Sequence, residues 1–358
     1  MGTAAGSGRG RDVRALAPLA GVYRAALAVR ERLRAAGITT RWALPQPVVS
    51  VGNLTLGGTS KTPLVIWLAE KLRARGMRPG VALRGYAGDY EGACARVPAT
   101  PGPGAARRFG DEACLIARRL QEVPVVVGRE RALAALELVS AAGVNLVILD
   151  DGFQHRRLGR DLDVVLLDAW APLGNGRLLP AGPLREPPSA LQRARLVIFS
   201  RWDEGPGGRA TEADPCASLA LAPGTRRARC RLRAAGLRGA RGEPVDGARV
   251  AAEGCLAFCG VARPDSFRTS LEASHVKPLR LVAFRDHHQF TPLELDGLVA
   301  QAALARAGWL VTTEKDAVRL DGWAPRGPRL AILRVDIEID EEAVVLDAVA
   351  AACARRAA

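Results

Sequence analysis

The chain has 358 residues, a length that accommodates two domains or one large α/β unit. Hydrophobic residues make up 48% of the chain and charged residues 25%, which excludes a wholly disordered protein. The formal net charge is +14, but only four of the 51 basic residues are lysines, so part of the excess reflects the arginine usage of a GC-rich genome and does not by itself identify a partner.

The seven cysteines are scattered and form no C-x-x-C pair, which argues against a disulfide framework or a zinc site and favours a reducing compartment. No uncharged apolar run reaches the roughly 18 to 20 residues that cross a bilayer. The N-terminus lacks the apolar segment of a signal peptide. We therefore expect a soluble or peripheral protein whose Gly- and Arg-rich residues 1–12 form a disordered tail.

An amphipathic helix is predicted over residues 18–36, because Pro18 suits its first turn and Gly37 its end. Its apolar stripe has three-four spacing and consists of Leu19, Val22, Ala26, Val29 and Leu33. Arg30 and Arg34 lie inside or beside the stripe, where their long stems could extend toward lipid phosphates. The pattern leaves two alternatives open, namely contact with a membrane surface and packing on the protein's own core.

Short β-branched runs then alternate with helical segments. Strands are predicted at 47–51, 81–84, 124–127, 144–149 and 163–167, and helices at 63–75, 111–121 and 130–142. This alternation predicts an α/β fold with a mainly parallel sheet covered by helices on both faces, like that of phosphate-loop NTPases. Ligands of such sheets bind at the carboxyl ends of the strands.

A Pro- and Gly-rich segment at 202–223 interrupts the alternation and is our candidate domain junction. Beyond it, strands are predicted at 255–259, 277–283 and 309–312 around a helix at 292–307. We therefore predict a phosphate-loop domain at 13–200, including the N-terminal helix, and a smaller α/β domain at 201–358. The C-terminal helix is expected to reach back onto the first domain.

The strongest local signal is a strand that runs into a Gly-rich loop and ends in Lys61-Thr62 at a helix start. Backbone N–H groups, the helix dipole and an ammonium then surround one anion. In such a loop Lys61 reaches the β- and γ-phosphates and Thr62 binds Mg²⁺. An ordinary Gly-rich turn is the alternative. Ser60 stands where the motif has Gly, which costs roughly 1 kcal/mol if this residue takes a positive φ.

A second signal is the apolar strand at 146–149, which ends in Asp150-Asp151. Two carboxylates in this position are typical of the Mg²⁺-binding element of phosphate-loop enzymes, with Asp150 facing the metal. Taken alone, a strand ending in Asp-Asp is also common in simple turns. The preceding loop makes the metal-binding interpretation the stronger one.

Two further segments place titratable side chains beside predicted helix starts. Asp111 and Glu112 begin a helix, where an acidic pair most often caps the helix or complements its dipole. His287 and His288, half of the four histidines, precede a helix that Thr291 could cap. A structural role and an acid–base role are both compatible with histidine here.

These four segments, in this order, resemble the tetraacyldisaccharide 4′-kinase family of lipid A biosynthesis. The likeness covers about residues 18–320 and includes Arg-Gly-Tyr at 84–86, Val-Val-Gly-Arg at 126–129 and Thr-Glu-Lys-Asp-Ala-Val at 313–318. The Gly- and Pro-rich run at 174–187 and the Asp-Asp-Gly-Phe-Gln-His string at 150–155 are specific to it. Five positions depart from the family pattern: Ser60, Leu83 for Ser, Ala87 for Gly, Ala113 for Pro and Arg285 for Pro.

The resemblance implies an enzyme on the cytoplasmic face of the bacterial inner membrane. Such an enzyme transfers the γ-phosphoryl group of ATP to the 4′-hydroxyl of a tetraacyldisaccharide 1-phosphate. It further implies two α/β domains joined by a hinge that closes over the nucleotide. The expected partners are ATP, Mg²⁺, the acylated disaccharide and an anionic membrane surface, and a monomer is favoured.

The resemblance also implies residue roles. Asp111 matches the base that takes the hydroxyl proton, assisted by His287, which favours chemistry over helix capping at Asp111. The nucleotide-binding positions are Gly57, Gly58, Thr59, Ser60, Lys61 and Thr62, and the metal-binding positions are Thr62, Asp150 and Asp151. The substrate-binding positions are Tyr86, Glu112, Arg129, Gln154 and Arg185.

Three other functions compete with this interpretation. A GTPase-like metal-insertion or sorting factor would share the phosphate loop, but no convincing Asn-Lys-x-Asp string for guanine recognition is present. A nucleic-acid-binding module is motivated only by the net charge, and aromatic residues make up only 4% of the chain, without a basic stripe interleaved with them. The third alternative is a nucleotide-binding scaffold without kinase activity, which the departure at Ser60 leaves open.

Overall fold

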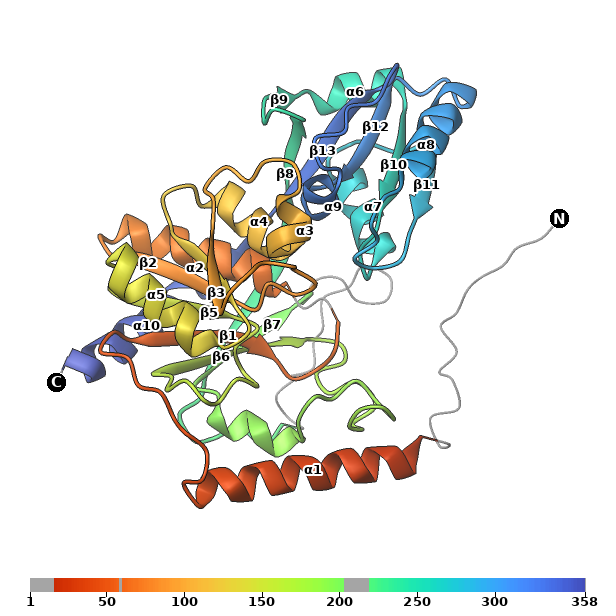
Figure 1. The fold of residues 1–358 in the computed structure, drawn as a ribbon. Coiled ribbons are helices and arrows are strands. Elements are labelled where there is room, and N and C mark those ends of the chain that lie inside the picture. The colour runs from red at the N-terminus through yellow and green to blue at the C-terminus, as the bar shows by residue number, and fades with distance from the viewer. Residues whose placement is uncertain (1–15, 58–59, 203–218, 358) are drawn as a thin grey trace.

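The computed structural model describes residues 16–57, 60–202 and 219–357. The predicted tail at 1–12, most of the predicted junction, Gly58 and Thr59 lie outside the described residues. The described part forms one mostly parallel 13-stranded sheet with helices on both faces (Figure 1). The strand order is β11-β10-β12-β13-β8-β7-β6-β1-β5-β2-β4-β3, with β9 paired to β8.

What we call the first half of the sheet is formed by residues 48–200. It contains β1 (Val48–Asn53), α2 (Lys61–Ala74), β2 (Pro79–Leu83), β3 (Cys94–Val97), α3 (Ala105–Phe109), α4 (Asp111–Arg119), β4 (Val125–Gly128), α5 (Arg131–Ala142), β5 (Leu146–Asp150), β6 (Leu162–Asp168), a 3-10 helix (Pro188–Arg193) and β7 (Leu196–Ser200). The strands are parallel except β3, which pairs antiparallel to β4 at the sheet edge. The predicted strands and helices of this half are confirmed, with ends that shift by up to two residues.

The second half is formed by residues 226–357. It contains β8 (Arg226–Gly239), β9 (Pro244–Val245), α6 (Gly247–Glu253), β10 (Cys255–Cys259), α7 (Pro264–Ala273), β11 (Arg280–Ala283), α8 (Pro292–Leu304), β12 (Trp309–Thr313), α9 (Glu314–Arg319), β13 (Arg329–Ile339) and α10 (Glu342–Ala357). Thr291 and Glu294 form a capping box at the start of α8, as expected for Thr291. The strand predicted from residue 277 begins only at Arg280.

Strand β8 joins the two halves. Its first residues, 226–230, pair in parallel with β7, and its residues 230–239 pair antiparallel with β13. The sheet therefore continues without a break through the place where the sequence predicts a second domain. The division into two domains at residue 200 stays a prediction.

The core lies on both faces of the sheet, which explains why the central strands read as continuous apolar runs. All six residues of β1 and all five of β5 are buried. On one face α2, α4 and α10 pack together with these strands in a single apolar cluster. On the other face α5 packs over β2, β4 and β5.

Helix α1 (Ala17–Ala35) lies along the outer edge of the molecule, below the first half in Figure 1. The predicted stripe does not pack on the core, because Leu19, Val22, Val29 and Leu33 are exposed. Leu27 is the one residue of the helix that is buried. The alternative in which the stripe contacts the protein's own core is therefore wrong.

The two arginines beside that stripe do not extend outward as expected. Arg30 donates to Glu186 at 3.0 Å, and Arg34 donates to Glu31 at 2.7 Å. Both side chains are therefore paired with carboxylates, although Arg30 is still 39% exposed. The Tyr23 hydroxyl also donates to the Arg185 carbonyl oxygen at 2.8 Å, which fixes the helix to the segment after residue 184.

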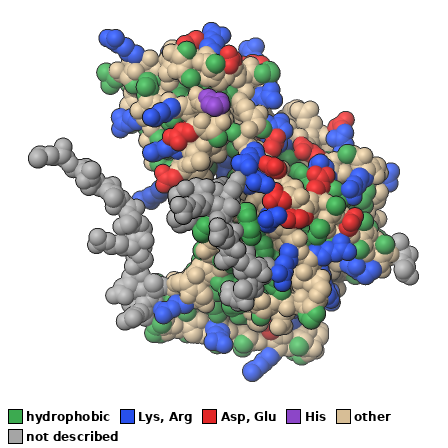
Figure 2. Space-filling view, turned by 180° about the vertical axis from the view of Figure 1, so that it is seen from behind, with side chains coloured by type: hydrophobic (Ala, Val, Ile, Leu, Met, Phe, Trp, Pro, Cys, Tyr) green, Lys and Arg blue, Asp and Glu red, His purple; other side chains and the backbone are tan. Residues whose placement is uncertain are grey.

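Many of the arginines form ion pairs within the protein. On the face shown in Figure 2, Lys and Arg side chains lie among Asp and Glu side chains. Pairs that join distant parts of the chain include Arg119–Glu314, Arg229–Glu341 and Arg185–Asp151. Among the described residues, no helix is both long and apolar enough to cross a bilayer.

Candidate active site

The phosphate loop connects β1 to α2, and Ser60 is the N-cap of α2. Ser60 has φ 60° and ψ 26°, which lies in the left-handed region. The motif Gly that Ser60 replaces is favoured here because it has no Cβ penalty in this conformation. Ala87, the other departure at a usual glycine, also has a positive φ of 59°. Both departures therefore fall on residues with a left-handed backbone conformation, which glycine adopts more easily than other residues.

Lys61 begins α2 and its ammonium turns back toward the ends of the strands. Its Nζ donates to Asn53 Oδ1 at 3.1 Å and lies 3.4 Å from Asp151 Oδ1. Asn53 is held in turn, because its Nδ2 donates to the Thr55 carbonyl oxygen. The lysine therefore lies at the carboxyl ends of β1 and β5, where a parallel sheet binds its ligands.

Asp150 is the last residue of β5 and pairs in register with Val51 of β1, so it lies beside the phosphate loop. Its side chain is buried, and Oδ1 has no hydrogen-bond partner. Burial, together with the charges of Glu112 and Asp151, raises the pKa of Asp150 to about 7. A buried carboxyl oxygen without a partner is an incomplete arrangement that a cation would complete.

Asp151 follows directly and has a positive φ of 52°. Arg185 Nη1 donates to Asp151 Oδ2 at 2.7 Å, and Lys61 lies on the other oxygen. Burial raises the pKa of Asp151, but these two cations outweigh burial and hold it below its ordinary value. Asp151 is therefore ionised and paired, whereas Asp150 is not.

Asp111 is the first residue of α4, and Gly110 is the N-cap. Its side chain does not cap the helix, although Oδ1 accepts a hydrogen bond from the Glu112 amide at 2.9 Å. Gly110 has φ 89°, and a Cβ there would come within 2.8 Å of the Tyr86 carbonyl oxygen. The Arg-Gly-Tyr segment therefore packs directly beneath Asp111 and fixes where its carboxylate points.

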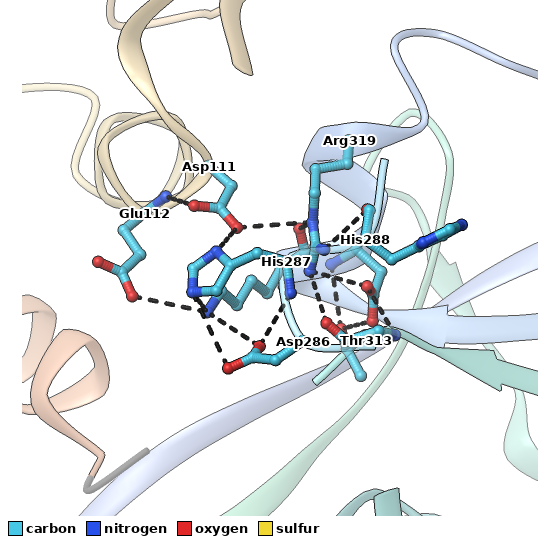
Figure 3. A network of polar contacts seen from close by, with 10 residues as sticks. Asp111, Glu112, Asp286, His287, His288, Thr313 and Arg319 are labelled. Atoms are coloured by element: carbon cyan, nitrogen blue, oxygen red, sulfur yellow. Dashed lines mark hydrogen bonds and ion pairs between the residues drawn. The ribbon is translucent and has the colours of Figure 1, made fainter. Parts of the chain in front are cut away.

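His287 reaches Asp111 from the opposite half of the sheet. It lies in the loop between β11 and α8, and its Nδ1 is 3.0 Å from Asp111 Oδ2, as Figure 3 shows. The hydrogen bond to Asp111 raises the pKa of His287, against burial and the positive charge of Lys315. Burial raises the pKa of Asp111, but His287, Lys315 and Arg319 outweigh it, so the net pKa is lowered. The predicted catalytic pair is thus in contact.

A fully buried arginine supports this pair from behind. Arg319 in α9 donates to the carbonyl oxygens of His288 and Gly260 at 2.9 and 3.0 Å, and its Nε lies 3.5 Å from Asp111 Oδ2. Asp316 neutralises it at 2.9 Å. Because α4 packs on α9, this guanidinium connects the helix that carries Asp111 to the loop that carries His287.

The remaining predicted residues lie around these two groups. Glu112 Oε1 is 3.5 Å from Lys315 Nζ, and the charge of Glu112 acts on Asp150, so the catalytic pair and the phosphate loop are neighbours. Gln154 Nε2 donates to the Asn53 carbonyl oxygen at 2.9 Å. The exposed ring of Tyr86 lies 6.0 Å from the His287 ring. For Gly57 and Thr62 the predicted binding role stays a prediction.

A cavity of about 230 Å³ opens beside Tyr86. Arg84, Tyr90 and Arg129 line it, together with the backbone of residues 85–88. Two guanidinium groups are suited to an anion. Arg129 lines this cavity, and Arg185 does not.

Sequence reasoning missed three residues of the site. Asn53 positions Lys61, Arg319 supports Asp111, and Lys315 contacts His287 at 3.1 Å. The string at 313–318 did single out Lys315, but without a role. Arg319, one residue beyond that string, carried no signal, because its contacts are made with residues distant in the sequence.

Comparison with known proteins adds the following findings. Residues 13–354 match the family described as Tetraacyldisaccharide-1-P 4′-kinase. A protein of Anaeromyxobacter dehalogenans called tetraacyldisaccharide 4′-kinase is 45% identical over 345 residues, covering 91% of this chain and 86% of the relative. One of Geobacter metallireducens is 42% identical over 300 residues, covering 82% and 85%.

A solved structure is also similar. It is the "apo" form of LpxK from Aquifex aeolicus, crystallised in complex with ATP. The TM-score is 0.74 at 28% sequence identity, and the match covers 95% of this chain and 99% of the other. The similarity therefore includes both halves of the sheet.

The pKa values of Asp150 and Asp151 are shifted in opposite directions, so replacing each residue should have the opposite effect on the stability of the protein. In Asp150 the folded pKa lies above the ordinary value of 3.8, so the protein loses stability as the pH rises from about 4 through about 7. Asp150→Asn cannot ionise, and we expect it to raise Tm at pH 8 and to raise it less at pH 5, both without divalent cations. Asp151→Asn is the matched control and should lower Tm at pH 8, because it removes a paired carboxylate. Equal losses in both variants at pH 8 would contradict this account of Asp150.

Proposed function

Because the chain belongs to the Tetraacyldisaccharide-1-P 4′-kinase family, we propose that it transfers the γ-phosphoryl group of ATP to the 4′-hydroxyl of a tetraacyldisaccharide 1-phosphate. The observation that carries the residue roles is the contact of Asp111 with His287, next to the buried end of β5. The GTPase-like and nucleic-acid-binding alternatives are not favoured, since neither describes the family or the relatives. An inactive scaffold would have lost part of this constellation, yet each charged member is in place.

The nucleotide binds at the N-terminus of α2, where free backbone N–H groups and the helix dipole attract phosphate. Lys61 supplies the ammonium for the terminal phosphates. In the structure it is held by Asn53 and Asp151, so ATP binding replaces part of these contacts. The pairing keeps the ammonium within the site before nucleotide arrives.

Asp111 acts as the base. The 4′-oxygen attacks the γ-phosphorus, its proton passes to Asp111, and the bond from phosphorus to the β–γ bridging oxygen breaks, so that ADP leaves with the electron pair. The lowered pKa keeps Asp111 ionised at neutral pH. His287 holds Oδ2, and the substrate hydroxyl uses the remaining lone pairs. Catalysis then depends on positioning and charge, as phosphoryl transfer generally does.

The residues at the end of β5 fit a magnesium ion. The unpartnered oxygen of Asp150 and the hydroxyl of Thr62 are hard donors of the kind Mg²⁺ prefers. The described residues contain no group of three or more His, Cys, Asp or Glu arranged to hold a metal. A magnesium ion here would therefore take its remaining ligands from phosphate oxygens and water. Bound Mg²⁺ would neutralise the charge of the triphosphate.

The acceptor approaches Asp111 past Tyr86. Arg129 and Arg185 are the arginines we assign to the phosphorylated disaccharide, together with Gln154 in the loop after β5. Glu112, one residue from the base, faces the same space. Because Arg185 is paired with Asp151 and Arg129 lines the separate cavity, the two arginines contact different parts of the substrates.

Helix α1 is the surface we assign to the membrane, on the cytoplasmic face of the inner membrane. Four of its apolar side chains are exposed along one side: Leu19, Val22, Val29 and Leu33. Exposed leucine and valine on a helix favour insertion at the headgroup boundary. Tyr23 and Arg30 fix the helix to residues 185 and 186, beside the site.

The direct test uses the purified full chain, γ-labelled ATP, Mg²⁺ and tetraacyldisaccharide 1-phosphate in detergent micelles. We expect label in the lipid fraction. ATP hydrolysis without labelled lipid would indicate another phosphate-loop NTPase, and nucleotide binding without turnover would indicate a scaffold. Either result, with a folded sample, overturns the proposed function.

Asp111→Asn tests the base. The amide keeps the shape of the side chain and cannot take a proton, so kcat should fall by about 10² to 10⁴ while KM for ATP changes little. Steady-state kinetics measure both constants. Asp89→Asn, which alters an exposed carboxylate paired with Arg107, is the control. A large rise in KM for ATP at normal kcat would remove Asp111 from this role.

Ser60→Gly tests the departure in the phosphate loop. Glycine takes the observed φ of 60° without Cβ strain, worth roughly 1 kcal/mol. We therefore expect the same or a lower Kd for ATP, measured by calorimetric titration. A clear loss of affinity would mean that the Ser60 hydroxyl itself contacts the nucleotide.

Val22→Glu tests the membrane surface. Val22 is 68% exposed, so the change leaves the fold intact and places a carboxylate on the face assigned to lipid. Cosedimentation with vesicles rich in anionic lipid should weaken by about tenfold. Leu304→Glu changes a still more exposed side chain on α8, 86% exposed, and should have no effect. Equal binding by both variants would exclude α1 as the docking surface.

A further inference from the structure

The ammonium of Lys315 faces the side of His287 opposite Asp111. Its Nζ lies 3.1 Å from His287 Nε2, while Asp111 Oδ2 lies 3.0 Å from Nδ1. The imidazole is therefore placed between a cation and an anion. Lys315 also lies 3.5 Å from Glu112 and 3.8 Å from Asp286, so two carboxylates lie beside it.

The geometry determines which nitrogen of His287 carries the proton. A lysine ammonium has three donors and no acceptor, so the nitrogen that faces it must offer a lone pair. Nε2 is therefore unprotonated and Nδ1 carries the hydrogen, which points at Asp111 Oδ2. Asp286 Oδ2, the competing acceptor for an Nε2–H, lies 4.0 Å away, beyond hydrogen-bond distance.

The backbone that carries Lys315 is rigidly held. Lys315 is in the first turn of α9, and the Thr313 side chain caps that helix by accepting from the Asp316 amide. Asp316 is fully buried and accepts from the Gly260 amide and the Thr313 hydroxyl. The lysine therefore reaches His287 from a fixed point, and only its side chain needs to be ordered.

Resting on the function proposed above, we propose that Lys315 is a positioning residue that holds His287 in the Nδ1–H tautomer and opposes a second proton on Nε2, so that Asp111 accepts the substrate proton. Without the ammonium, His287 would bind a second proton on Nε2 and become an imidazolium. An imidazolium bound to Asp111 makes that carboxylate a weaker base. Lys315 touches neither reacting atom and acts only through His287.

The charges around His287 act in opposite directions: the hydrogen bond to Asp111 leaves the pKa of His287 raised overall, and Lys315 limits that rise. Asp111 and Asp286 favour the charged imidazole, Lys315 opposes it, and Arg319 acts on the other side of Asp111. Tyr86 contributes only its ring. Among the described residues, Lys315 is the lysine that contacts the His287 ring.

Lys315→Met removes the charge and keeps the length of the side chain. We expect kcat to fall by about tenfold with little change in KM for ATP, and the acid limb of the kcat profile to move to higher pH, because an imidazole without the neighbouring cation protonates more easily. Lys315→Arg keeps a cation and should leave the limb near its original pH. Lys277→Met, at an exposed lysine distant from the site, is the control.

A second measurement does not depend on turnover. Nitrogen-15 NMR distinguishes the two tautomers and the imidazolium, and the chain has only four histidines to assign. We expect His287 with Nδ1–H in the unaltered protein and an imidazolium at neutral pH in Lys315→Met. An unchanged His287 spectrum, or an acid limb that does not move while kcat falls, would overturn the proposal. If the unaltered protein transfers no label but shows the Nδ1–H tautomer, the proposed function fails and the assignment of Lys315 to His287 stands.

Discussion

Carboxylates crowd the space between the two halves of the sheet, and their mutual repulsion is the constraint on which the site depends. Asp111, Glu112, Asp150, Asp151 and Asp286 all face this space. Lys61, Lys315, Arg185 and Arg319 are distributed among them, so that four of these acids have a cation within 4.0 Å, and Asp150 does not. The site thus contains one unneutralised position, which is the position assigned to a divalent ion. Binding of the highly charged substrates requires these cations to be shared between protein and phosphate.

The sequence predicted most of the first half of the sheet and the paired residues Asp111 and His287, because apolar strands and short motifs are local signals. It did not predict β8 or β13. β8 is rich in arginine and buries only part of its length, so it lacks an apolar pattern, and it forms because β7 and β13 supply its hydrogen bonds. The sequence identified the apolar stripe on α1 but not whether the stripe faces solvent or the core. That depends on the contacts of Tyr23 and Arg30 with residues 156 or more positions away in the chain.

Lys315 and Arg319 illustrate a second limit. Their residue types are unremarkable on a short helix, and their roles arise only when α9 packs on α4 and the loop after β11 closes over both. Ser60 and Ala87 show the reverse case. Each was visible in the sequence as a departure at a usual glycine, and the positive φ of each explains why glycine is usual there. A sequence identifies such positions as exceptions, and only the backbone conformation supplies the reason.

The continuity of β8 has a consequence for how the two halves align. Opposite Gly236, which has φ 92°, the pairing of β8 with β13 shifts register between Leu333 and Val335, so the sheet has one irregular step there. The pairs on either side of that step remain in register. Two strands paired in this way allow the sheet to bend at this step, while the regular pairs on either side keep the strands from sliding along each other. Asp111 and His287 come from opposite sides of this step, so the register of β8 with β13 sets where the two side chains meet.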